Sequence, residues 1–169
     1  QSGISIFNNS INLFGNTLLH TMAMSSGIFI TTGSTIDLRN NAIINNLGNG
    51  DAAYGSCAVY VQSSQSQLLN SDYNNYFVNP TGSGIKAIGK ISTTTTSTNI
   101  SSWKTATGRD KSSLNYDPGF ISSTNLLPDI NNQNSWSIKG RGTQIPSVSN
   151  DYNGNLRSTS LSGGAPSIG

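Results

Sequence analysis

The chain has 169 residues, of which only 34% are hydrophobic and 9% charged, and its formal net charge is +2. Disordered chains combine low hydrophobicity with high net charge, and this chain does not meet the second condition. Its nine Lys and Arg residues are scattered, which excludes the basic patch typical of nucleic-acid-binding proteins. All seven acidic residues are Asp, and Asn, Ser, Thr and Gly are abundant, so the composition favours short strands joined by many turns.

A repeat with an offset of 32 residues organises the first part of the chain. Residues 4–11 and 36–43 both read apolar-x-apolar-x-Asn-Asn-small-Ile, and residues 69–76 are a looser third copy. Alternate residues of a strand face the same side, which predicts one inward-facing set of apolar side chains. This set comprises Ile4, Ile6, Ile36, Leu38, Val59 and Val61.

A second series of strand-length segments lies between these copies, at residues 27–30, 57–61 and 84–88. Each coil of the repeat therefore offers three short strands separated by polar turns. Such strands are too short to form a free-standing sheet, but stacked coils join them into long parallel sheets around one core. The pattern predicts an all-β parallel β-helix.

The Asn pairs of the repeat stand where the chain must turn sharply between two strands. Asn tolerates the left-handed backbone conformation and hydrogen-bonds to its neighbours. We therefore expect a ladder of turn residues along one edge, formed by Asn8, Asn9, Asn40, Asn41 and Asn74. The alternative is that these are ordinary loop residues of an Asn-rich chain.

Residues 99–169 no longer follow the repeat. A short helix is predicted over residues 102–107, with Ser101 or Ser102 as its N-cap and Gly108 as its C-terminal stop. We expect Trp103 to pack across the open end of the coils, because a terminal coil otherwise exposes apolar side chains and strand edges.

Four segments in this order resemble the right-handed parallel β-helix (pectate-lyase-like) domains of secreted Bacteroidota-type surface proteins. They are Ser-Asp-Tyr-Asn-Asn-Tyr-Phe at 71–77, Ile-Ser-Ser-Trp-Lys-Thr-Ala-Thr-Gly-Arg-Asp at 100–110 with its Ala-Thr-Gly-x-Asp ending, Tyr-Asp-Pro-Gly-Phe at 116–120, and Asn-Asp-Tyr-Asn-Gly-Asn-Leu-Arg at 150–157 with Pro-Ser-Ile-Gly at 166–169. The resemblance covers nearly the whole chain. Residues 137–142 depart from the family's usual Gly-Ser-Pro-type segment.

The resemblance implies a right-handed solenoid with three short strands per coil, a short capping helix and an irregular C-terminal cap. Residues 1–98 would be coils of a longer solenoid, and residues 99–169 the C-terminal capping region of the same domain. The family motifs imply cap roles for Trp103, Asp117 and Arg157.

The same resemblance implies a secreted or cell-surface location in a bacterium. The secretion machinery would then be a partner during export, and a type IX-style sorting domain would follow residue 169. No apolar stretch approaches the ~20 residues of a membrane-spanning helix, so we expect no membrane insertion.

Polysaccharide lyases and glycoside hydrolases share this fold, which raises the question of catalysis. Hydrolases need carboxylates that face one groove, whereas Asp37 and Asp72 fall at the turns of the repeat. Lys86 and Lys90 alternate with apolar residues, so we expect a solvated face. Cys57 lies in an apolar run and is expected to be buried. No cofactor is indicated, although a Ca²⁺ site built from Asn and Asp turn oxygens is left open.

Carbohydrate binding is compatible with the composition, because sugars stack on aromatic rings and hydrogen-bond to Asn, Ser and Thr. Candidate contact residues are Tyr54, Tyr60, Tyr73 and Trp136, for each of which packing is the alternative. We expect a non-catalytic part of a large exported protein, acting as a stalk or as an adhesion surface for polysaccharide or cell-surface glycan. The alternative is the C-terminal part of a polysaccharide lyase or glycoside hydrolase whose active site lies in upstream coils.

Overall fold

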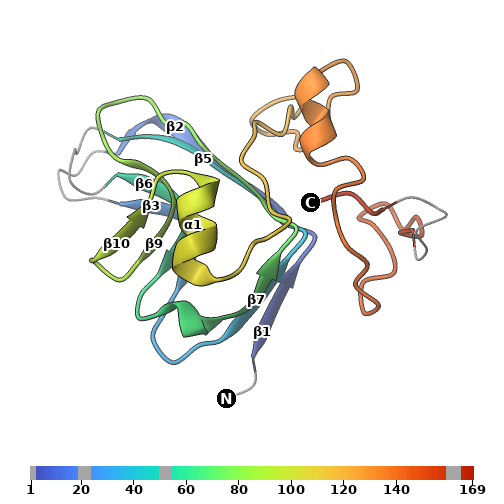
Figure 1. The fold of residues 1–169 in the computed structure, drawn as a ribbon. Coiled ribbons are helices and arrows are strands. Elements are labelled where there is room, and N and C mark those ends of the chain that lie inside the picture. The colour runs from blue at the N-terminus through green and yellow to red at the C-terminus, as the bar shows by residue number, and fades with distance from the viewer. Residues whose placement is uncertain (1–2, 19–23, 50–54, 159–164) are drawn as a thin grey trace.

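The structure is a computed structural model that describes residues 3–18, 24–49, 55–158 and 165–169 (Figure 1). Within these ranges strands dominate, and helix is limited to α1 (Ile100–Thr107) and two 3-10 turns, η1 (Gln65–Gln67) and η2 (Gln133–Ser137). None of the described helices has the length and hydropathy needed to cross a membrane. The predicted all-β class is confirmed.

Three sheets of parallel strands enclose a shared core (Figure 1). The first sheet consists of β1 (Ile4–Phe7), β4 (Ile36–Arg39) and β7 (Leu68–Asp72). The second consists of β2 (Ser10–Leu18), β5 (Ala42–Asn49) and β8 (Asn75–Val78). The third consists of β3 (Ser25–Ile30), β6 (Ser56–Val61) and β9 (Lys86–Ile91), with β10 (Thr95–Ser97) antiparallel at its edge. The chain visits the three sheets in this order three times, and each passage is called a coil below.

The strands pair in the register that the repeat predicts. Ile4 lies beside Ile36 in the first sheet, and Ile11 lies beside Ile43 in the second. Residues at equivalent positions of successive repeats therefore pair across adjacent strands. Between β4 and β7 the register shifts after Ile36, which accounts for the looser third copy.

The core follows the predicted alternation in the second coil. Ile36, Leu38, Val59 and Val61 are buried and belong to one hydrophobic cluster. Ile4, the counterpart of Ile36 in the first coil, is instead 49% exposed. The expected place of Ile4 in the core is wrong, because no described strand pairs with the other edge of β1.

The two lysines of β9 differ in their surroundings. Lys86 is exposed, as expected, and its Nζ donates to Asn79 Oδ1 (3.3 Å). Lys90 is buried, contrary to expectation, because it lies in register between Tyr60 of β6 and Thr96 of β10. The cross-strand neighbours therefore remove Lys90 from solvent.

Helix α1 follows the third coil and begins two residues earlier than predicted. Asn99 is the N-cap, and its side chain accepts a hydrogen bond from the Ser102 N–H (2.9 Å). The predicted cap at Ser101 or Ser102 is wrong, since Ser102 is the third helical residue and its hydroxyl accepts from the Asn99 N–H (3.4 Å). The predicted stop at Gly108 is confirmed by its left-handed φ of 65°.

Trp103 of α1 lies fully buried in the core cluster beside β9. Gly89 makes this possible, because a Cβ at that position would overlap the indole ring. Leu114 then extends the second sheet, accepting from the Tyr76 N–H (3.0 Å) and donating to the Asn74 carbonyl (2.8 Å). Residues 100–116 therefore cover the end of the third coil.

The described chain after Asp117 flanks the side of the coils (Figure 1). Ile138 and Ile168 pack with Ala42 and Ile44 of β5 in a second hydrophobic cluster. The backbone N–H of Ile168 also donates a hydrogen bond to the Ile138 carbonyl (2.8 Å), and the N–H of Gly169 donates to the Asn40 carbonyl (2.7 Å). This segment forms a lateral layer rather than a further coil.

Candidate functional site

Stacked Asn side chains form a hydrogen-bonded ladder at the turn between the first and second sheets. Asn41 Oδ1 accepts from the backbone N–H (3.0 Å) and the Nδ2 (3.2 Å) of Asn9. Asn74 Oδ1 accepts the same pair of bonds from Asn41, at 2.9 and 3.1 Å. The hydroxyl of Ser113 ends the series by accepting from the Asn74 N–H (2.9 Å). The ladder joins successive coils at this corner.

The residue before each ladder position has a left-handed backbone. Asn8, Asn40 and Tyr73 have φ values of 54°, 59° and 55°. The two members of each Asn pair therefore differ in role: the first adopts the unusual conformation and the second builds the ladder. Tyr73 shows that the turn imposes this conformation even where the residue is not Asn.

A buried carboxylate, Asp110, closes the ladder at the capped end. Its side chain accepts hydrogen bonds from Ser71 Oγ (3.0 Å), Asn74 Nδ2 (3.3 Å), Tyr76 OH (2.9 Å), Trp103 Nε1 (2.9 Å) and Ser113 Oγ (2.6 Å). All five donors are neutral. Among the described residues the one ion pair is Arg39–Asp37 (2.7 Å), on the outer face of the first sheet.

Burial raises the pKa of Asp110 above its ordinary value, and its hydrogen bonds only partly offset this effect. The pKa of Tyr76 is also raised, first by burial and then by the charge of Asp110. A perturbed carboxyl group can mark a functional site. Asp110, however, is 1% exposed and lines none of the cavities described below, so its contacts give it a structural role in joining α1 to the third coil.

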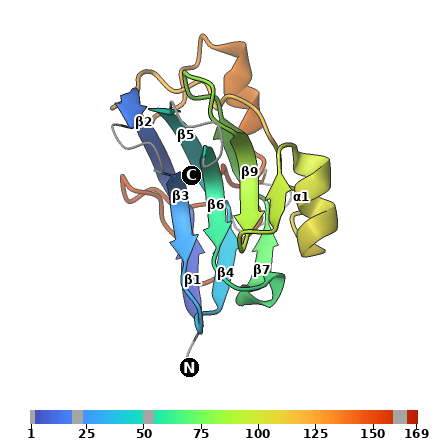
Figure 2. The same cartoon turned by 90° about the vertical axis from the view of Figure 1, so that its left-hand side faces the viewer.

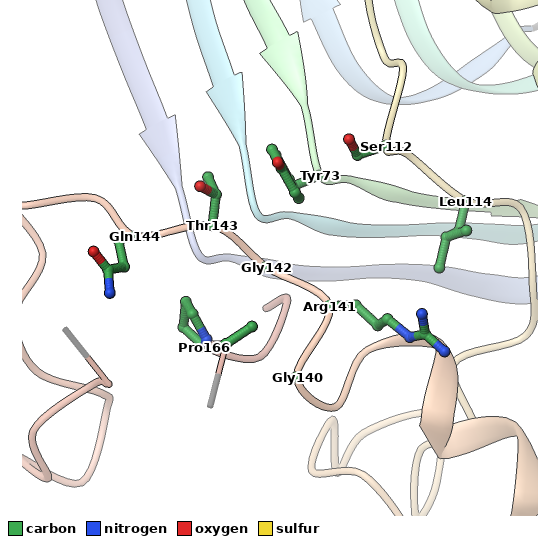
Figure 3. A pocket seen from close by; sticks show the side chains of 10 residues that line it. Tyr73, Ser112, Leu114, Gly140, Arg141, Gly142, Thr143, Gln144 and Pro166 are labelled. Carbon is green, nitrogen blue, oxygen red and sulfur yellow. The ribbon is translucent and has the colours of Figure 1, made fainter. Parts of the chain in front are cut away.

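A groove of about 530 Å³ lies between the turn corner and the lateral layer (Figure 3). Tyr73, Ser112 and Leu114 form one wall, and residues 140–144 with 165–166 form the other. Figure 3 shows Arg141 near Leu114 at one end and Gln144 at the other. The lining offers hydroxyl, amide and guanidinium groups and contains no carboxylate.

Arg141 is the charged side chain of this groove. Its guanidinium lies 4.9 Å from the centroid of the Trp136 ring, and its Nε donates to the Trp136 carbonyl (3.3 Å). Tyr116 packs against the same indole, with centroids 4.9 Å apart and the rings tilted by 60°. Trp136 and Tyr116 remain 40% and 51% exposed. Since no carboxylate of the described chain pairs with Arg141, its charge is available to a ligand.

The three predicted carbohydrate contacts that lie within the described residues do not form one surface. Tyr73 lines the groove, and Trp136 adjoins it through Arg141. Tyr60 lies on the outer face of the third sheet, stacked on Phe29 with centroids 5.1 Å apart and an interplanar angle of 23°. Each of these rings covers one face of the other, which leaves fewer open faces for a sugar. Tyr54 lies outside the described residues.

The predicted cap residues Asp117 and Arg157 make local contacts. Asp117 Oδ1 accepts from the Gly119 N–H (2.9 Å), and Arg157 Nε donates to the Asn150 carbonyl (3.1 Å). Arg157 also lines a smaller cavity of about 250 Å³, which Asn8 lines as well. Neither side chain lines the groove.

The chemical groups needed for catalysis do not gather in the described part of the chain. Asp37 is paired with Arg39, and Asp72 Oδ1 accepts from the Ser112 N–H (2.6 Å). No three His, Cys, Asp or Glu side chains in the described ranges are placed to hold a metal ion together. Burial raises the pKa of the Cys57 thiol to about 12, so the reactive thiolate is scarce at neutral pH.

Asp110 and Arg141 are the residues that the sequence analysis did not assign to a site. Asp110 ends the Ala-Thr-Gly-x-Asp motif, so its position directly after the helix stop could have indicated a role at the end of the helix. Arg141 stands between two glycines in an irregular segment, and no periodic pattern points to it. Its neighbours in the groove come from distant parts of the chain, which only the fold brings together.

Comparisons with protein-family models, curated proteins and solved structures find no match to this chain. The chemistry of the groove therefore carries the functional argument. One guanidinium, several neutral hydrogen-bonding groups and two exposed aromatic rings nearby can hold a polar ligand. They supply no pair of carboxylates for hydrolysis.

Proposed function

We propose that the chain is a non-catalytic stretch of a right-handed parallel β-helix in a secreted or cell-surface bacterial protein, and that it contacts carbohydrate through the groove. The observation that carries this proposal is the lining of the groove, which combines Arg141 with neutral polar groups and lacks a carboxylate. The proposed architecture is supported by three parallel sheets visited in a constant order.

The stacked coils suit the role of a stalk or adhesion surface. Every coil of a solenoid contacts only its neighbours, so the fold can extend without a larger core. The Asn9–Asn41–Asn74 ladder adds directional hydrogen bonds to each such contact. A rigid scaffold of this kind holds the groove in a fixed shape for a ligand.

The groove suits an oligosaccharide because its donors and acceptors are spread along its walls. Ser112, Thr143 and Gln144 can hydrogen-bond to hydroxyl groups, while Arg141 can hold a carboxylate or an uncharged oxygen. The exposed rings of Trp136 and Tyr116 extend this surface beside Arg141. The place of the chain in an exported protein rests on the family resemblance, and fractionation of the producing cells would test it.

A glycan array with the purified chain tests the carbohydrate proposal. We expect R141A and W136A to bind any retained glycan at least roughly tenfold more weakly, the equivalent of about 1.4 kcal/mol. R39A is the matched control, because it removes the same charge from the outer face of the first sheet. Circular dichroism spectra of all variants show whether the fold is retained.

The same samples also address the rival function, a polysaccharide lyase or hydrolase. Incubation of each polysaccharide with the intact protein, followed by sizing of the products, would reveal depolymerisation. Cleavage that disappears in R141A would replace the binding proposal with a catalytic one. If the wild type and R141A bind a glycan equally well, the groove is not the carbohydrate-binding site.

A further inference from the structure

The first coil is far more exposed than the coils stacked on it. Ile4 is 49% exposed, whereas its neighbour Ile36 is 5% exposed and Leu68, the next residue in the row, is fully buried. Ile11 is likewise only partly buried, whereas Ile43 beside it is fully buried. The hydrophobic core is therefore uncovered at the end formed by the first coil.

The two ends of the stack also differ in their strand edges (Figure 2). At the far end, the Ser71 carbonyl of β7 accepts from the Asp110 N–H (2.8 Å), Leu114 pairs with β8, and β10 pairs with β9. At the near end, β1, β2 and β3 are all edge strands, and no described strand pairs with their outer sides. Such edges are templates for pairing with further strands.

The Asn ladder is open at the same end. The Oδ1 atoms of Asn41 and Asn74 each accept two hydrogen bonds from the preceding ladder residue. Asn9 is exposed, and no described residue donates to its Oδ1, although its own donors are used. The vacant acceptor matches the backbone N–H and Nδ2 of one more Asn turn running in the same direction.

We propose that this face binds one more coil of parallel β-structure with the chain's own repeat, joined to the chain ahead of Ile4. The ladder requires a parallel turn, and the rows of Ile4 and Ile11 require apolar partners. A second copy of this chain cannot supply a parallel coil, because its corresponding end is covered by α1 and residues 109–116.

Covalent connection follows from the geometry of the existing coils. β3 ends at Ile30 and β4 begins at Ile36, so a short link joins consecutive coils. An added coil stacked on β1 would end equally close to Ile4. A separate peptide would lose translational and rotational freedom on binding, and strands this short do not hold a shape of their own. This inference rests on the proposed β-helix architecture and is independent of the proposed carbohydrate contact.

A tandem chain tests the proposal. Residues 4–35 are duplicated ahead of Ile4, which preserves the 32-residue register of the repeat. We expect amide hydrogens of the original β1, β2 and β3 to exchange at least roughly tenfold more slowly than in the parent chain, because they become interior. The midpoint of thermal unfolding should also rise.

The matched control is the same tandem chain with Ile6→Asp and Ile11→Asp in the added copy only. It has the same length and the same Asn turn but cannot bury its inward side chains. We expect its original strands to exchange as fast as in the parent chain. Equal protection in the tandem chain and its control, or no protection in either, would overturn the proposal. Protection in the parent chain that grows with protein concentration would point instead to a second copy.

Discussion

The side-chain amide of Asn40 pairs with the backbone of Thr143 in both directions. Asn40 Nδ2 donates to the Thr143 carbonyl (2.6 Å), and the Thr143 N–H donates to Asn40 Oδ1 (2.8 Å). The same Asn40 residue has a left-handed backbone and accepts from the Gly169 N–H through its carbonyl. One turn residue therefore anchors the lateral layer to the corner of the coils and shapes the groove.

Replacing Asn40 with Gly separates the role of its backbone conformation from that of its side chain. Gly adopts the left-handed conformation without strain, so N40G removes the two hydrogen bonds to Thr143 and leaves the turn intact. We expect a loss of about 1–3 kcal/mol in the free energy of unfolding, because buried polar groups lose their partners. Hydrogen exchange should accelerate at Thr143 and Gly169. The matched variant is N8G, since Asn8 has the same backbone conformation but its Oδ1 has no partner in the described chain. A loss in N8G as large as in N40G would contradict the assignment.

Removing the middle amide of the ladder should destabilise the stack. N41A leaves the Asn9 N–H without its acceptor and removes the Nδ2 donor to Asn74 Oδ1 and to the Ile6 and Arg39 carbonyls, while the backbone N–H of residue 41 still donates to Asn74 Oδ1. We expect a loss of about 2–4 kcal/mol, measured by urea unfolding, because several buried groups become unsatisfied at once. N9A is the control, since Asn9 is exposed at the open end and should cost less than about 1 kcal/mol. Equal losses would show that the ladder contributes nothing beyond its individual turns.

The buried Asp110 predicts an unusual pH dependence. Its folded-state pKa lies above the unfolded value of 3.8, so the folded protein retains a proton that the unfolded chain releases. Stability from this group is therefore greatest below 3.8 and falls as pH rises towards the raised pKa. D110N removes the titration. The difference in unfolding free energy between wild type and D110N should shrink as pH increases from 4 to 8, measured by urea unfolding at each pH.

Asp151 provides a control of opposite sign. Hydrogen bonds from Asn155 lower its pKa, so its contribution is present above 3.8 and lost as pH falls through the folded value. The difference between wild type and D151N should therefore grow with pH, although by a small amount because the side chain is exposed. A wild-type–D110N difference that also grows with pH would contradict the raised pKa of Asp110.

The contact between Gly89 and Trp103 predicts a sharp steric effect. In G89A the new methyl group overlaps the indole, so the ring or α1 must shift. We expect a loss of about 1–3 kcal/mol and a change in the near-ultraviolet circular dichroism of the tryptophans. G108A is the comparison, because its Cβ meets no neighbour and only the left-handed φ of 65° is strained. That variant should lose about 1 kcal/mol with little change in the tryptophan signal. An unaltered spectrum in G89A would contradict the packing of Trp103 on β9.

The coils were predictable because their signals are local or strictly periodic. The offset from Ile4 to Ile36 set the parallel register, and alternation placed Leu38 and Val61 in the core. Alternation could not show that Ile4 would remain exposed, because exposure depends on whether another strand lies next to β1. The N-cap at Asn99 was missed because Asn99, Ser101 and Ser102 are all good capping residues, and the connection from β10 decides among them.

By itself the sequence determined the strand-rich class, the repeat and the helix stop at Gly108, because apolar spacing and glycine conformation act over a few neighbouring residues. Only the tertiary structure decided where the irregular second half lies and what it brings together. Asp110 meets Ser71, Asn74 and Tyr76, and Arg141 lies with Leu114 in the lining of the groove, through contacts between residues far apart in the chain. The contacts of Asp110 depend on how α1 packs on the third coil, and the groove depends on how the chain returns after Asp117. No periodic pattern encodes either path.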